Sequence, residues 1–245
     1  MKNVKIYALN NGNNAVSFFK KAFDEGAAAV QCDIRRTLDG QFIAFRDRNL
    51  SRMCGRDWVV SGTSWSHIKN LPVRSGEPIP HLDDLLKFMV LHPGAVFFFR
   101  ALLNTAQDVA DLAHQISRAG VQTRGVITVS SSRLSFISAA RKSVHDIGTA
   151  FCSSFPGGIV EKAKRTCTKR VCILPGRFPG GKTVLRMLSA MGSLADQVAE
   201  AAAEGIEISI GTVNGPNTLR RILDTGVKSL WTSDVELSAK LLKQR

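Results

Sequence analysis

Short apolar runs alternate with amphipathic stretches along the chain, and this alternation restricts the fold more than any other feature of the sequence. The runs that we expect to form buried strands are residues 4–8, 28–34, 95–99, 126–129, 147–151, 170–174, 206–210 and 228–232. Segments with helical periodicity separate them, at residues 16–23, 82–91, 106–119, 134–142, 159–164, 194–203, 218–224 and 235–243. This order is typical of parallel strands joined by crossover helices.

A series of about eight strand–helix units is what a (β/α)8 TIM barrel requires, and such barrels commonly have about 250 residues. We therefore predict an α/β fold in which residues 1–245 form a single TIM barrel. A doubly wound open sheet is the alternative, because the pattern does not show whether the sheet closes. Turn-forming and polar residues interrupt the pattern after the second strand, which predicts a small insertion at about 48–80.

Charge and cysteine content narrow the class of protein. The chain has 33 Lys and Arg against 20 Asp and Glu, and its formal net charge of +13 favours polyanionic partners. The five cysteines are scattered without a CxxC pair, which favours a reducing compartment, the cytoplasm or the mitochondrion, over a disulfide framework or a zinc site. No apolar run has the roughly 18 residues of a membrane span, and we identify no targeting segment.

Five segments, in order along nearly the whole chain, carry a resemblance to a known family. Residues 26–40 (GAAAVQCDIRRTLDG) resemble the GADxIExDVxxTxDG segment of glycerophosphodiester phosphodiesterases, and residues 45–52 (FRDRNLSR) resemble their FHDxxLxR segment. Residues 76–86 resemble the PxLxExL segment that follows the family's insertion. Residues 210–214 resemble the WTVN strand, and residues 226–234 resemble the GVDGIITD segment. The resemblance implies a TIM barrel and a phosphodiester cleaved by two histidines with a divalent cation.

The chain departs from the family where the resemblance places the reactive residues. Leu9 stands at the position of the first histidine and Arg46 at that of the second. Arginine stays protonated, so it cannot both donate and accept a proton. Of the three metal ligands that the resemblance implies, Gln31 and Phe98 replace two, and Asp33 is left. Because Mg²⁺ or Ca²⁺ takes about six or more oxygen ligands, usually with more than one carboxylate, we expect these positions to bind no metal.

These substitutions lead us to expect a catalytically inactive barrel without a cofactor, acting as a structural or interaction subunit. The charge favours a polyanion-containing assembly such as an organellar ribonucleoprotein, with protein subunits and RNA rather than a small-molecule substrate as partners. The alternative is a divergent metal-dependent phosphodiesterase that uses Asp33, Asp47 and arginines. The candidate contacts to RNA or an acidic partner are Lys162, Lys164, Arg165, Lys169 and Arg170.

Residues 176–183 (GRFPGGKT) match the phosphate-binding pattern GxxxxGK[ST]. In a P-loop, backbone amides and the lysine contact phosphates while the hydroxyl group holds Mg²⁺. Here the segment follows the sixth strand of a barrel-like series, so a phosphate or nucleotide contact through Lys182 and Thr183 is the weaker alternative function. Arg46 and Arg100 are further candidates for anion binding, and simple ion pairing is their other interpretation. For Asp33 we expect an ion pair with Arg35, Arg46 or Arg100 at the barrel mouth.

Overall fold

The computed structural model of the chain describes residues 4–10, 12, 14–175, 183 and 193–244. The strands are β1 (Lys5–Ala8), β2 (Ala29–Arg36), β3 (Phe42–Ala44), β4 (Phe97–Ala101), β5 (Gly125–Ser130), β6 (Thr149–Ser153), β7 (Arg170–Ile173), β8 (Glu207–Gly211) and β9 (Ser229–Thr232). The helices are α1 (Val16–Asp24), α2 (Ser51–Cys54), η1 (Val60–Gly62), α3 (Trp65–Ile68), α4 (Leu82–Leu91), α5 (Ala106–Arg118), α6 (Ser135–Ser143), α7 (Ile159–Arg165), α9 (Ser193–Ala203), α10 (Pro216–Asp224) and α11 (Val235–Lys243).

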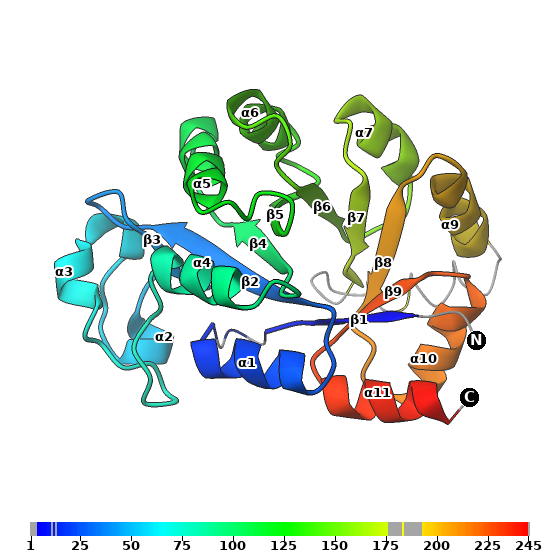
Figure 1. Ribbon diagram of the computed structural model, residues 1–245, viewed down its shortest axis with the longest axis horizontal. Helices are drawn as coiled ribbons and strands as arrows, with labels where there is room; N and C mark the ends of the chain where they lie inside the picture. The colour runs from blue at the N-terminus through cyan, green and yellow to red at the C-terminus, as the bar shows by residue number, and fades with distance from the viewer. Residues whose placement is uncertain (1–3, 11, 13, 176–182, 184–192, 245) are drawn as a thin grey trace.

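The sheet closes into a barrel. Its strands follow the order β1-β9-β8-β7-β6-β5-β4-β2-β3, and β1 also pairs in parallel with β2, where Tyr7 is opposite Ala29 and Ala8 is opposite Val30. Strand β3 is antiparallel to β2, so it extends the sheet beside a ring of parallel strands. The longer helices surround this ring (Figure 1). The predicted (β/α)8 TIM barrel is confirmed, and the pairing of β1 with β2 excludes the open sheet.

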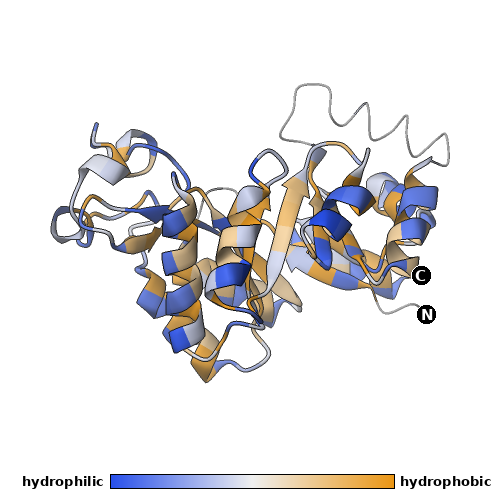
Figure 2. Cartoon of the chain, turned by 90° about the horizontal axis from the view of Figure 1, so that it is seen from above, coloured by the Kyte–Doolittle hydropathy of each residue, from blue (hydrophilic) through white to orange (hydrophobic). Residues whose placement is uncertain are grey.

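Apolar side chains fill two layers of the barrel because strand residues point alternately to opposite faces. In β4, Phe97 and Phe99 belong to the large cluster that includes residues of the surrounding helices, whereas Phe98 belongs to a smaller cluster with Tyr7 and Trp231 inside the ring. The strands are accordingly apolar along much of their length, while the helices have mixed surfaces (Figure 2). None of the described helices is both long enough and apolar enough to span a membrane.

The predicted insertion at about 48–80 contains α2, η1 and α3, and the short strand β3 precedes it; all four elements lie between β2 and α4 at one side of the barrel (Figure 1). These short elements pack around a separate apolar cluster of Ile43, Phe45, Leu50, Val60, Ile68 and Ile79. Helix α4 then begins after His81, whose ring Nδ1 accepts a hydrogen bond from the Asp83 amide as an N-cap. The insertion therefore has a core of its own, beside the carboxyl end of β2.

Candidate functional site

The carboxyl ends of several barrel strands surround a cavity of about 300 Å³, which we call the mouth cavity. In TIM barrels this end of the strands carries the active site. The charged side chains that line the cavity are Arg35 at the end of β2, Arg100 near the end of β4, and Arg133 after β5. Its polar lining residues are Asn104, Ser130, Cys152, Ser153 and Ser154.

A buried ion pair joins two strands at this mouth. Asp33 and Arg100 are register partners in β2 and β4, and Arg100 Nε lies 2.5 Å from Asp33 Oδ1. Their side chains are only 2% and 11% exposed. The Asp33 amide donates a hydrogen bond to Asn14 Oδ1 at 2.8 Å. The strand register thus fixes the carboxylate against the guanidinium, as in the ion-pairing interpretation of Asp33.

The other two arginines of the mouth cavity are held by backbone carbonyl groups. Arg35 donates from Nε and Nη2 to the Arg46 carbonyl oxygen, at 3.0 and 2.8 Å. Arg133 Nη1 donates to the Leu103 carbonyl oxygen at 2.6 Å, and its guanidinium lies 5.4 Å from the centre of the Phe136 ring. Burial lowers the pKa of Arg35 from its ordinary value. These bonds orient both guanidinium groups without neutralising them.

Three of the positions where the resemblance places reactive residues are buried inside the barrel. Leu9 and Phe98 are buried in the apolar cluster inside the ring, and the Phe98 ring centre lies 5.1 Å from that of Trp231. Gln31 is buried in β2 as the register partner of Phe98. The ring interior at this level is therefore filled with packed aromatic and aliphatic side chains.

The donor set does not fit the divalent cation that the family resemblance implies. The Asp33 carboxylate forms an ion pair with Arg100. The register partner of Gln31 is Phe98, whose side chain has no atom that could bind a metal ion. Within the described residues, no three His, Cys, Asp or Glu side chains come together as a metal site would require. The positive charge of Arg100 would also repel a cation placed beside Asp33. A divalent cation of this kind is bound mainly by oxygen ligands, usually with more than one carboxylate.

Arg46, another predicted anion-binding residue, is absent from the described lining of the mouth cavity. Arg46 offers its carbonyl oxygen to Arg35, and its side chain lies near the backbone of Gly12. Lys182 falls outside the described residues, as does the rest of the 176–182 segment, and Thr183 is exposed. The structure thus brings Arg100 into the cavity and leaves Arg46 beside it.

The basic cluster predicted to contact RNA or an acidic partner lies at the other end of the barrel. Its residues are in α7, in the loop that follows, and at the amino end of β7. Lys164 forms an ion pair with Glu204 at 2.7 Å, and Lys169 donates to the Glu204 carbonyl oxygen at 3.5 Å. Arg165 is exposed. One carboxylate therefore offsets part of this charge.

Sequence reasoning did not identify Arg133 as a site residue. It lies in the loop between β5 and α6, and its contact with Leu103 joins this loop to the one that follows β4. Its position shortly after a predicted strand could have indicated a site residue, because the loops at the carboxyl ends of the strands form the mouth of a barrel. Arg35 was considered only as a partner of Asp33.

The comparison with known protein families decides the identity of this barrel. The model of the glycerophosphoryl diester phosphodiesterase family matches residues 7–237. The chain belongs to this family. It is 24% identical over 240 residues to a probable glycerophosphodiester phosphodiesterase 2 of Mycobacterium tuberculosis, covering 95% of this chain and 86% of that protein.

Solved structures share the fold of this family member. A glycerophosphodiester phosphodiesterase from Parabacteroides distasonis superposes with a TM-score of 0.80 at 17% identity, covering all of this chain and 98% of the other. An Oleispira antarctica phosphodiesterase in complex with the product sn-glycerol-3-phosphate gives a TM-score of 0.78 at 15% identity, covering 98% of this chain and 96% of the other.

The expectation of an inactive scaffold subunit in an organellar ribonucleoprotein is wrong. The family match runs through almost the whole chain, and the family is one of phosphodiesterases, as is the mycobacterial relative. The error came from treating the replacement of the two histidines by Leu9 and Arg46 as loss of function. The net charge of +13 was then assigned to a macromolecular partner.

Proposed function

We propose that the chain binds glycerophosphodiesters in the mouth cavity and hydrolyses them slowly, with arginine side chains in place of a divalent cation. The observation that supports this is the gathering of Arg35, Arg100 and Arg133 around one cavity whose described lining holds no carboxylate. Asp33 balances one of the three positive charges, so the cavity remains cationic. Guanidinium groups match the paired oxygens of a phosphate through parallel hydrogen bonds.

The electrostatics of the mouth suit the transition state as well as the bound ester. In phosphoryl transfer, negative charge lies on the non-bridging oxygens while water attacks and the alcohol leaves, and fixed positive groups stabilise that charge. Positioned histidines would add about 10²–10⁴-fold by proton transfer. Because Leu9 and Arg46 stand at those positions, we expect hydrolysis far slower than in members that keep both histidines. The complex of the Oleispira phosphodiesterase with sn-glycerol-3-phosphate supports this class of ligand.

The proposal is tested by following release of sn-glycerol 3-phosphate from glycerophosphocholine, with EDTA and with added Mg²⁺ or Ca²⁺, and by calorimetric titration with the product. We expect slow release that EDTA does not abolish. Arg133→Ala should weaken product binding about ten- to a hundredfold, since hydrogen bonds to charged groups contribute about 1.5–3 kcal/mol. Arg165→Ala removes the same charge at the other end of the barrel and should bind normally. Absence of product binding, or turnover that depends wholly on the added cation, would refute the proposal.

A further inference from the structure

A second cavity, of about 310 Å³, adjoins the mouth cavity on the side of the insertion. We call it the insertion cavity. Both cavities are lined by Arg35, Leu102, Leu103 and Asn104, so these residues form a shared wall. The other residues that line the insertion cavity are Arg36, Arg48, Val60, Ser61 and Asp108. A ligand bound in the mouth could therefore extend along the wall into this second space.

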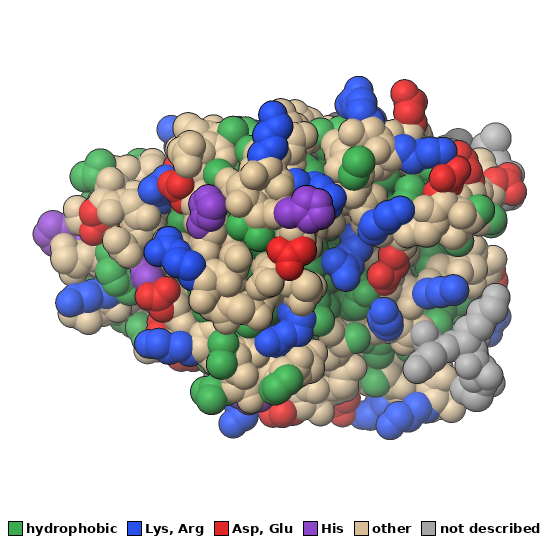
Figure 3. Space-filling model, turned by 45° about the horizontal axis from the view of Figure 1, so that its top comes forward, with side chains coloured by type: hydrophobic (Ala, Val, Ile, Leu, Met, Phe, Trp, Pro, Cys, Tyr) green, Lys and Arg blue, Asp and Glu red, His purple; other side chains and the backbone are tan. Residues whose placement is uncertain are grey.

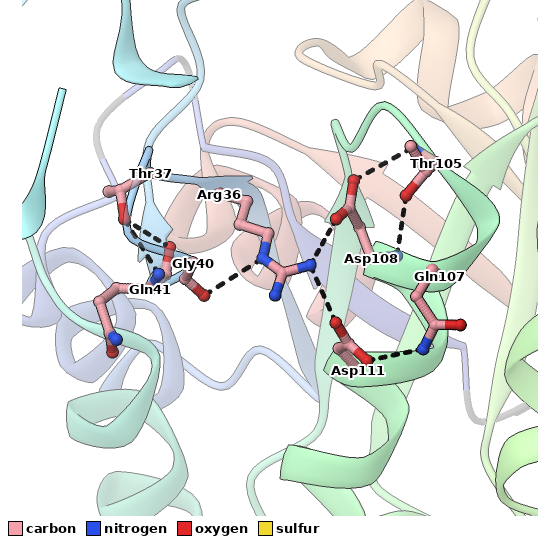
Figure 4. Close-up of polar contacts among 8 residues, drawn as sticks. All are labelled: Arg36, Thr37, Gly40, Gln41, Thr105, Gln107, Asp108 and Asp111. Atoms are coloured by element: carbon pink, nitrogen blue, oxygen red, sulfur yellow. Dashed lines mark hydrogen bonds and ion pairs between the residues drawn. The ribbon is translucent and has the colours of Figure 1, made fainter. Parts of the chain in front are cut away.

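One arginine of the insertion cavity is committed to the fold. Arg36 Nη1 lies 2.5 Å from Asp108 Oδ1 and 2.9 Å from Asp111 Oδ2, while its Nε donates to the Gly40 carbonyl oxygen at 3.2 Å (Figure 4). Burial lowers the pKa of Arg36, but the two carboxylates raise it above its ordinary value. Because two carboxylates contact Arg36 and balance its charge, Arg36 attracts an anionic ligand only weakly.

The positive charge of Arg48 is not balanced in this way. Arg48 is exposed on the insertion, and among the described residues the carboxylate of its neighbour Asp47 forms its ion pair with Arg52 instead, at 2.7 Å. Burial is the main cause of the lowered pKa of Arg35; Asp33 and Asp47 raise this pKa, and Arg48 is close enough to lower it in turn. Two guanidinium groups that repel each other across a cavity favour an anion between or beside them.

We propose that the insertion cavity binds a second anionic group of the substrate, a phosphate carried by the alcohol that is esterified to glycerophosphate. The preferred substrates would then be glycerophosphodiesters with a phosphorylated headgroup. The diester lies against Arg100 and Arg133, the headgroup carbons follow Leu102 and Leu103, and the second phosphate meets Arg48 and the Ser61 hydroxyl. This inference rests on the proposed function, because it assumes that the mouth cavity holds the diester.

The test compares two probes that differ by one phosphate: glycerophosphoinositol and glycerophosphoinositol bearing a phosphomonoester on the inositol ring. Dissociation constants are measured by calorimetry for the whole chain and its variants. We expect the phosphorylated probe to bind about five- to tenfold more tightly, as a charge-assisted contact with a partly exposed arginine allows. Arg48→Ala should remove this preference, and Arg48→Lys should restore part of it.

Arg74→Ala is the matched control, since it removes one positive charge from the same insertion at an exposed position outside both cavities. It should keep the preference. Equal binding of the two probes, or a preference that survives Arg48→Ala, would refute the second anion site while leaving the proposed function intact. If neither probe binds, both the site and the proposed function are refuted. Because Arg48 is exposed, its replacement is expected to leave the fold unchanged, and the thermal unfolding midpoint checks this.

Discussion

At the scale of single residues, the buried pair of Asp33 and Arg100 places two opposite charges where the barrel would otherwise be apolar. Removing both charges from water is unfavourable, and their attraction offsets that cost only while both are present. Loss of one partner leaves the other buried without a counter-charge. The pair thus holds Arg100 in place, and Arg100 is also one of the three cationic groups in the described lining of the cavity.

We predict that Arg100→Met alone destabilises the fold by about 3–5 kcal/mol, as does Asp33→Leu alone, because each leaves an unpaired buried charge. The double variant should be close to the wild type in stability, since two apolar side chains replace both charges. Urea unfolding of the four proteins measures the difference. A double variant whose loss equals the sum of the two single losses would contradict this account of the pair.

The sequence located this pair only in part. The resemblance put Asp33 at a ligand position and Arg100 near it, and the residues alone allowed Arg35, Arg46 or Arg100 as the partner. The choice depends on the register between β2 and β4, which sets Asp33 directly beside Arg100. Strand register comes from contacts across the whole sheet, so a linear pattern does not determine it.

At the scale of elements, the start of α5 is tied to the end of β2. Thr105 and Asp108 form a capping box, in which the Asp108 amide donates to Thr105 Oγ1 and Asp108 Oδ2 accepts from the Thr105 amide. The other oxygen of Asp108 pairs with Arg36 of β2 (Figure 4). One carboxylate therefore accepts a hydrogen bond from a backbone amide at the start of the helix and also fixes that helix to a strand of the barrel.

We predict that Asp108→Ala costs about 1–2 kcal/mol of stability, and Asp111→Ala less than about 1 kcal/mol, because Asp111 contributes an ion pair without a cap. Thermal or urea unfolding at neutral pH distinguishes the two. Equal losses would show that the capping box adds nothing to the ion pair. Both carboxylates are partly exposed, so solvent screening keeps the ion-pair part small.

The same carboxylate predicts a pH dependence. Burial raises the pKa of Asp108, but the hydrogen bonds from Arg36 and Thr105 outweigh it, and the pKa lies below its ordinary value. A depressed pKa means that the stabilisation is fully present above the unfolded-state pKa of about 3.9 and is lost as the pH falls through the native value. The stability gap between wild type and Asp108→Asn should therefore be largest near pH 7 and close below about pH 4. A gap that stays constant from pH 7 to pH 3 would contradict this linkage.

Element types were predicted well where periodicity is long and poorly where it is short. The helix expected at residues 106–119 is α5, and the strand expected at 95–99 is β4, displaced by two residues. The single turns α2 and α3 have four residues each. Helices this short show no helical periodicity in the sequence, so the sequence predicted the insertion but not the short helices within it.

At the scale of the whole molecule, closure of the ring is what brings the three arginines of the mouth together. Arg35, Arg100 and Arg133 come from β2, β4 and the loop after β5, so they converge only because those strands are neighbours in a closed, parallel sheet. Closure depends on strand tilt and stagger, which no local pattern specifies. The number of strand–helix units therefore predicted a barrel. Which side chains meet at its mouth could be known only from the pairing of the strands in the structure.

The net charge of +13 belongs to the whole molecule, and Lys and Arg side chains are spread over the face in Figure 3 with Asp and Glu among them. Self-repulsion of this kind weakens as salt is added, so we predict that the unfolding midpoint rises with ionic strength in a non-denaturing salt such as sodium chloride. Sulfate should add a specific increment, because it resembles the phosphate that the mouth cavity is proposed to hold. At ten times its dissociation constant, a bound anion stabilises the native state by about 1.4 kcal/mol.

Thermal unfolding at matched ionic strength in chloride and in sulfate separates the two effects. Sulfate also stabilises proteins by exclusion from their surfaces, so the informative quantity is the sulfate increment of a variant relative to the wild type. Arg133→Ala should lose part of that increment, whereas Arg165→Ala, with the same net charge and its substitution at the other end of the barrel, should keep it. Equal increments in all three proteins would mean that sulfate acts only on the general charge and that the arginines of the mouth do not form an anion site.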